Sequence, residues 1–286
     1  MNDMKSNGGD APASEAGGGD DAAMNAHAMP QSVDDLEELL STRLAEQKRL
    51  MDAQTNARSC TERLTYEALG TLILPLDVAQ GIIADVFHRL DGKAWPSEGD
   101  ILSRHVLLAS FASSMSLAQV ITIQGLYVPA ATLVRQQMEC VTQLDAIESG
   151  KPRRKDRTAH VGALRWKLAK AYGSLSDIAH NDPMKLLQLL AEQHAAAPDS
   201  DLSAPAGEAD RQAVSISVYP RYIEWKARQL LSQQACLALI AAAHALCFMQ
   251  DVSSEIISED DAALIQYLGV ALEGHGIVEP TKKSVT

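Results

Sequence analysis

The sequence predicts an all-α protein, a helical bundle. Aromatic residues make up 4% of the 286 residues, and Ala and Leu are abundant. Strands favour aromatic and β-branched residues, whereas Ala and Leu favour helices. Apolar residues also recur at helical spacing from Gln31 to about residue 272. Since 46% of the residues are hydrophobic, a chain of this length can bury a substantial core.

Residues 1–30, rich in Gly, Ala and Asp, predict a disordered N-terminal tail, because they contain too little apolar surface to offset the entropy of ordering. Residues 31–280 then predict a single all-helical domain. Within it the apolar periodicity predicts nine helices: 33–57, 60–73, 76–91, 98–125, 128–148, 157–180, 183–195, 221–250 and 259–272.

Start and stop signals set the ends of these helices. Pro75 removes a backbone donor, so it should break or kink a helix, and Gly150 with Pro152 should end helix 128–148. Asp182-Pro183 should end one helix and cap the next. Four Ser-x-x-acid pairs resemble capping boxes: Ser32 with Asp35, Ser59 with Glu62, Ser97 with Asp100 and Ser258 with Asp261.

Charge and hydropathy predict a location and exclude some functions. The formal charge of -12 excludes a generally basic nucleic-acid surface, although a local patch such as the basic segment 151–157 is compatible with it. The N-terminus lacks the apolar core of a secretory signal. The apolar stretch Ala235–Met249 is shorter than the roughly 20 residues that span a bilayer. These observations predict a cytoplasmic protein without membrane insertion.

Cysteine and histidine spacing gives no support for a metal or another cofactor. Cys60, Cys140, Cys236 and Cys247 form no C-x-x-C pair and lie within or beside apolar helical patterns, so we expect them to be reduced and mostly buried. Asp177 and His180 have a spacing that could hold an ion, but the paired Glu-x-x-His motifs of di-metal bundles are absent. We expect neither metal nor cofactor.

A polar stripe on one predicted helix is the strongest functional signal. Tyr172, Ser176 and His180 follow one another at intervals of four, so they share one face. This face lies beside the apolar residues of the same helix, which predicts that the stripe is half buried. A phenol, a hydroxyl and an imidazole together indicate either a site or a polar contact between helices.

Helix 128–148 is apolar around most of its circumference and therefore central. Its narrow polar strip contains Arg135, Glu139 and Thr142. One interpretation is a solvent-facing Arg–Glu pair at i,i+4. The other is that the strip faces the stripe of Tyr172, Ser176 and His180 across an antiparallel hairpin, where a half-buried arginine needs a charged partner.

The run from Gly125 to Glu139, followed by Tyr172-x-x-Leu175-Ser176-x-x-x-His180, resembles a group of bacterial HEPN-like helical proteins. That group pairs an Arg-x-x-x-Glu helix, matched by Arg135 and Glu139, with a later Tyr-x-x-Leu-Ser-x-x-x-His helix. The resemblance covers about residues 100–185. It implies an all-helical fold with a HEPN-like central hairpin.

The resemblance also implies a role. HEPN proteins include ribonucleases, toxins and phage-defence effectors, many of them dimers, and their active site has an Arg and a His with four to six residues between them. In this chain no arginine stands at that spacing before His180. An active version would use His180 as general acid or base and Arg135 to neutralise a phosphate, with Ser176, Tyr172 and Glu139 completing the candidate catalytic site.

Two functions therefore remain open. The first is a role in stress or phage defence through RNA or partner binding, with metal-independent RNA cleavage as its enzymatic form, and with a homo-oligomer implied by the family. The second is a non-catalytic interaction module in which the same residues form a structural polar network.

Overall fold

The computed structural model describes residues 32–94, 99–150, 161, 164, 168–186, 219–253 and 259–274. The predicted tail, the basic segment 151–157 and the serines at 97 and 258 lie outside these residues. The chain divides into two compact units, Met1–Arg49 and Leu50–Thr286, each of which is described by itself. A single domain over 31–280 stays a prediction.

Every regular element within the described ranges is helical, which confirms the predicted all-α fold. These helices are α1 (Val33–Leu90), α2 (Gly99–Ile123), α3 (Tyr127–Glu148), α4 (Ala169–Ala179), α6 (Glu224–Ser253) and α7 (Glu259–Gly274). The predictions for 98–125, 128–148, 221–250 and 259–272 agree with α2, α3, α6 and α7 to within a few residues.

The first turn of α1 is closed by the predicted capping box. The Ser32 Oγ accepts from the Asp35 amide at 3.1 Å, and the Asp35 carboxylate accepts from the Ser32 amide at 3.1 Å. Two amide donors that a helix start would leave unpaired are thereby satisfied.

The prediction of three separate helices between residues 33 and 91 is wrong, because α1 is continuous across Ser59 and Pro75. The proline is accommodated by a kink, with Leu69 at φ -127° and ψ 16° one to two turns earlier. Pro75 and Leu69 are both buried, and the helix is kinked without ending, which is one of the two outcomes predicted for Pro75.

The turn between α2 and α3 depends on Gly125. Its φ is +79°, and the amides of Gly125 and Leu126 donate to the carbonyls of Thr122 and Ile121 at 3.0 and 2.8 Å. This is the Schellman arrangement that ends many helices. A Cβ at position 125 would lie 2.8 Å from the Arg221 carbonyl oxygen and 2.9 Å from a Thr61 methyl carbon.

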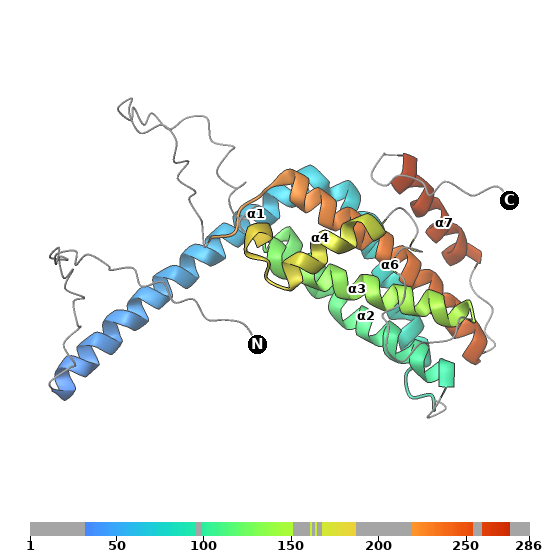
Figure 1. Ribbon diagram of the computed structural model, residues 1–286, viewed down its shortest axis with the longest axis horizontal. Coiled ribbons are helices and arrows are strands. Elements are labelled where there is room, and N and C mark those ends of the chain that lie inside the picture. Colours follow the sequence, from blue (N-terminus) through green and yellow to red (C-terminus); the bar gives the residue numbers. More distant parts are fainter. Residues whose placement is uncertain are drawn as a thin grey trace, which may run out of the picture. The chain divides into compact units, whose positions relative to one another are not determined.

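Helices α2, α3 and α6 pack against one another, α4 lies on α3, and α7 lies on α6 (Figure 1). The largest fully buried side chains are aliphatic or aromatic and come from α1, α2, α3 and α6. α6 has more buried residues than the other described helices, and they are spread along most of its length. The candidate residues on α3 and α4 thus lie on a pair of helices that packs against this core through α3.

The segment before α4 differs from its prediction. The sequence favours one helix over 157–180, but α4 begins at Ala169, and the described residues Val161, Leu164 and Leu168 precede it outside any α-helix. All three are buried, so tertiary contacts override helical periodicity here. As predicted, Asp182 caps the next helix, its carboxylate accepting from the amides of Met184 and Lys185 at 2.9 and 3.0 Å.

The predictions of a cytoplasmic location and of no membrane insertion require correction. Among the described residues, α1, α2 and α6 are long and apolar enough to cross a membrane, judged by length and composition. The apolar stretch Ala235–Met249 is only part of α6, which extends over 30 residues, and α2 extends over 25. A helix of n residues is about 1.5n Å long, so both helices exceed the roughly 30 Å of a bilayer core. Both predictions are therefore wrong.

Candidate functional site

Three of the five predicted site residues meet where α3 contacts α4. The Arg135 guanidinium is 2.9 Å from the Glu139 carboxylate, and the Tyr172 hydroxyl donates to the same carboxylate oxygen at 2.7 Å. The guanidinium carbon also lies 5.6 Å from the centre of the Tyr172 ring. We call Arg135, Glu139 and Tyr172 the α3–α4 network. The structure thus contains parts of both sequence interpretations, because Arg135 and Glu139 pair at i,i+4 and Tyr172 of α4 contacts that pair.

The surroundings of the Tyr172 phenol hold it in its neutral form. Burial raises the pKa of Tyr172, and the hydrogen bond to Glu139 raises it further, while Arg135 acts in the opposite direction. A neutral phenol can donate to the carboxylate, whereas a phenolate beside it would be repelled. Glu139 therefore receives one charged and one neutral donor, while the Nε of Arg135 is buried without a hydrogen-bond partner.

Ser176 and His180 do not join this network. Ser176 is half buried on α4, and its carbonyl oxygen accepts from the His180 amide at 2.9 Å. His180 is the exposed residue that ends α4. Within the described part of the chain, the His180 side chain has no hydrogen bond or ion pair with Arg135. The stripe therefore splits into a bonded end at Tyr172 and an open end at His180.

A second polar group, which sequence reasoning missed, joins α2, α3 and α6. The Arg104 guanidinium lies 3.0 Å from Glu148 and 2.5 Å from Asp251. His244 places one ring nitrogen 2.9 Å from Asp145 and the other 2.9 Å from Glu148. We call these five residues the charged cluster. Because a carboxylate only accepts, both nitrogens of His244 must donate, which is the charged imidazolium.

Part of the charged cluster carries a visible signal in the sequence. Asp145 and Glu148 stand three apart near the end of α3, and His244 interrupts the most apolar stretch of the chain. A polar residue within an apolar helix requires partners elsewhere. The identity of those partners depends on the packing of α2 and α6, which helical periodicity does not contain.

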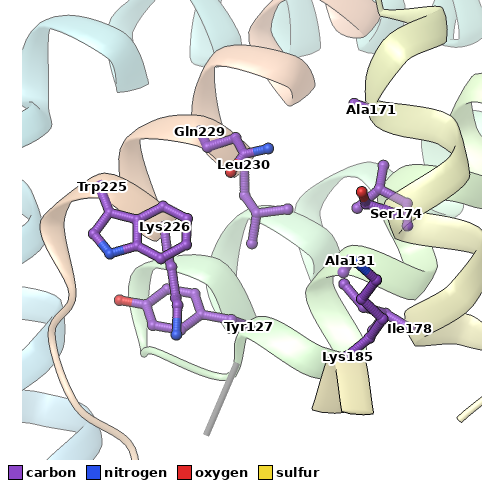
Figure 2. A pocket seen from close by; sticks show the side chains of 11 residues that line it. Tyr127, Ala131, Ala171, Ser174, Ile178, Lys185, Trp225, Lys226, Gln229 and Leu230 are labelled. Carbon is purple, nitrogen blue, oxygen red and sulfur yellow. The ribbon is translucent and has the colours of Figure 1, made fainter. Parts of the chain in front are cut away.

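A cleft of about 200 Å³ opens between the start of α3, α4 and the start of α6 (Figure 2). Tyr127, Trp225 and Lys226 form one side, while Ala171, Ser174 and Ile178 face them from α4. Its other lining residues are Ala131, Leu175, Lys185, Gln229 and Leu230. This cleft is not evident from the sequence, because its lining residues come from three separate segments.

Two side chains fix the cleft on the α6 side. The Tyr127 hydroxyl accepts from the Ile223 amide at 2.9 Å, which ties the start of α3 to the residue before α6. Burial raises the pKa of Tyr127 to about 12, so the phenol stays neutral. Lys226 is 2% exposed, and its ammonium lies 5.2 Å from the Trp225 ring. The cleft thus has an apolar wall with a buried cation in it.

The described residues contain no group of three or more His, Cys, Asp or Glu arranged to hold a metal ion. All four cysteines are free, with Cys140 and Cys236 buried and Cys60 and Cys247 exposed. Burial raises the pKa of Cys140, which disfavours its reactive thiolate.

Comparisons of the chain with family models, curated proteins and solved structures gave no match. The resemblance to HEPN-like proteins therefore stays a prediction based on the motifs around Arg135 and His180.

Proposed function

We propose that this chain is a non-catalytic helical binding module of the HEPN-like type, in which the α3–α4 network holds one wall of a ligand cleft. The observation that carries the proposal is the shared carboxylate of Glu139, which pairs with Arg135 at 2.9 Å and accepts from Tyr172 at 2.7 Å. The charge of Arg135 is paired within the protein, so we assign it a role in holding the helices together and not in binding a substrate.

The short length of α4 explains why such a contact is needed. Eleven residues are fewer than an isolated helix requires for stability in water, about 12–15. Leu175, the buried residue of α4, supplies apolar packing, and Tyr172 supplies the directional bond to α3. Because Ala171, Ser174 and Ile178 of α4 also line the cleft, the contact that holds α4 shapes the cleft.

The ribonuclease alternative has less support. General acid–base chemistry on a ribose hydroxyl requires a histidine within hydrogen-bonding reach of the proton it moves, near the group that neutralises the phosphate. Arg135 is instead engaged by Glu139, and His180 stands exposed at the end of α4.

The test measures RNA cleavage and thermal unfolding on the same preparations of the full chain, Arg135→Ala and Glu139→Gln. We expect no cleavage of single-stranded RNA by the parent protein. Both variants should unfold at lower temperature, with a loss of about 1–2 kcal/mol, because each leaves a polar partner unpaired in a group that water partly reaches. Lys170→Met, which alters an exposed residue of α4, is the matched control and should unfold like the parent.

RNA cleavage by the parent that disappears in both Arg135→Ala and His180→Ala, with unfolding temperatures unchanged, would contradict the proposal and favour the enzyme.

A further inference from the structure

We infer that the first turns of α1, within the unit Met1–Arg49, bind a second copy of this chain in antiparallel orientation. The contact surface consists of four apolar side chains on one face of the helix, which we call the α1 stripe: Val33, Leu36, Leu40 and Leu44. It shares no residue with α3, α4 or α6, so the inference does not depend on the proposed function.

The α1 stripe is an exposed apolar face. Every residue from 33 to 49 is exposed, and the four residues of the α1 stripe are between 43% and 72% exposed. On a helix that turns about 100° per residue, they fall within an arc of about 80°. Helices in proteins gain most of their stability by packing such a face against another element. The described residues of Met1–Arg49 supply no such element, because all of them belong to this one helix and its cap.

The charge along the same segment changes sign. Residues 33–38 contain four acidic side chains and no basic one, whereas residues 39–49 contain three basic side chains and one acidic side chain. The acidic one, Glu46, is paired with Arg43 at 2.8 Å. Two parallel copies would place one acidic start beside the other, and like charges across an interface oppose association. Two antiparallel copies place the acidic start of each beside the basic part of the other, so charge complementarity favours a second copy in that orientation.

The antiparallel orientation also brings one pair of opposite charges together. If Leu40 of one copy packs against Leu44 of the other, the centre of the contact lies at residue 42. Glu37 is then five residues before the centre and Lys48 six residues after it, so the two copies bring them within about 1.5 Å of the same level along the axis. Both stand on the same flank of the α1 stripe, about 20° apart around the helix. Since a twofold antiparallel pair brings each flank against itself, Glu37 of each copy faces Lys48 of the other.

The experiment is sedimentation equilibrium of the full chain at about 0.15 M salt. We expect a dimer that dissociates on dilution. Leu40→Lys should raise the dissociation constant at least about a hundredfold, because it removes one leucine of each copy from the centre of the contact. Val270→Lys, a similar change at a position 62% exposed on α7, is the matched control and should dimerise like the parent.

An exchange of charges tests the orientation. Glu37→Lys alone should weaken the dimer about fivefold to tenfold, because it places like charges together twice in each dimer. Lys48→Glu alone should do the same, and the two changes together should restore the dissociation constant to near that of the parent. Glu38→Lys makes the same charge change on the opposite side of the helix, so it is the control and should dimerise like the parent.

A monomeric parent chain overturns the inference, and so does a Leu40→Lys variant that dimerises like the parent. A double variant that binds no better than either single variant overturns the antiparallel orientation. If the parent is monomeric but floats with phosphatidylcholine vesicles, and Leu40→Lys does not float, then the α1 stripe contacts lipid and the second copy is ruled out.

Discussion

The α3–α4 network and the charged cluster both contain an arginine bound to carboxylates, but they differ in how the chain assembles them. Arg135 and Glu139 are neighbours on one helix, and their side chains are 24% and 25% exposed. Arg104 is 10% exposed, and its partners lie 44 and 147 positions away in the sequence. The network reinforces a single helix and one neighbour, whereas the cluster joins α2, α3 and α6.

This difference indicates which polar contacts determine the stability of the bundle as a whole. Removing one member of a buried charged group leaves the others without compensation in a site that water reaches poorly. In a half-exposed group, water replaces part of what is lost. The cluster should therefore determine global stability, and the network should determine the local position of α4.

Arg104→Met gives the largest expected effect. The change leaves Glu148 and Asp251 without their shared cation and removes the guanidinium from the Phe248 ring, 5.4 Å away. We expect a loss of about 2–3 kcal/mol in the free energy of unfolding, at the low end for a buried pair because Asp251 is 55% exposed. Denaturant unfolding followed by circular dichroism measures it.

The matched control is Arg228→Met, which breaks the exposed 2.7 Å pair with Glu224 on α6. Its unfolding midpoint should stay close to that of the parent. Equal losses in Arg104→Met and Arg228→Met would show that burial does not separate the two kinds of pair.

Tyr172→Phe gives an intermediate effect. It removes the donor to Glu139 but leaves the pair with Arg135, so we expect a loss of about 1 kcal/mol. Because the pKa of Tyr172 is raised above its ordinary value of 10.0, this contribution is present below pH 10. It is lost as the pH rises through the higher pKa of the folded state.

Melting temperatures of the parent and Tyr172→Phe between pH 7 and alkaline pH measure this contribution. The difference between the two should shrink above about pH 10. Tyr267→Phe, at a position 70% exposed on α7, is the control and should melt like the parent at pH 7. A difference that grows with alkaline pH would contradict the neutral-donor assignment of Tyr172.

His180→Ala gives the smallest effect. His180 is exposed at the end of α4, so its removal should change the free energy of unfolding by less than about 0.5 kcal/mol. A loss comparable to that of Tyr172→Phe would place His180 in the α3–α4 network. It would contradict the conclusion that Tyr172 belongs to this network and His180 does not.

The sequence predicts the features that depend on local periodicity. It yields the all-helical class, the ends of α2 and α3, the capping box of Ser32 with Asp35, and the facing of Arg135, Glu139 and Tyr172. These features depend on residues within a few turns of one another, or on two polar stripes that each need a partner.

The sequence does not predict what depends on three-dimensional packing. Of the two outcomes predicted for Pro75, a break or a kink, the kinked helix is found, and the choice depends on the buried surroundings of the proline. The partners of His244 come from α3, 99 positions away in the case of Asp145. Lys226 is 2% exposed and lines the cleft together with residues of α3 and α4, and its position in the sequence does not indicate this burial. The length of α2 and α6, which is sufficient to cross a membrane, is not evident from unbroken apolar runs, because scattered polar residues interrupt both helices.

The turn at Gly125 has a consequence for how sequences of this fold can diverge. Three segments meet there, because the turn itself, Thr61 of α1 and the backbone of Arg221 approach so closely that a methyl group has no room. Both the positive φ and the missing volume require glycine, so compensation would need simultaneous changes in segments far apart along the chain. Divergent chains that keep this packing must keep glycine at this position, while the exposed residues of α4 can vary one at a time.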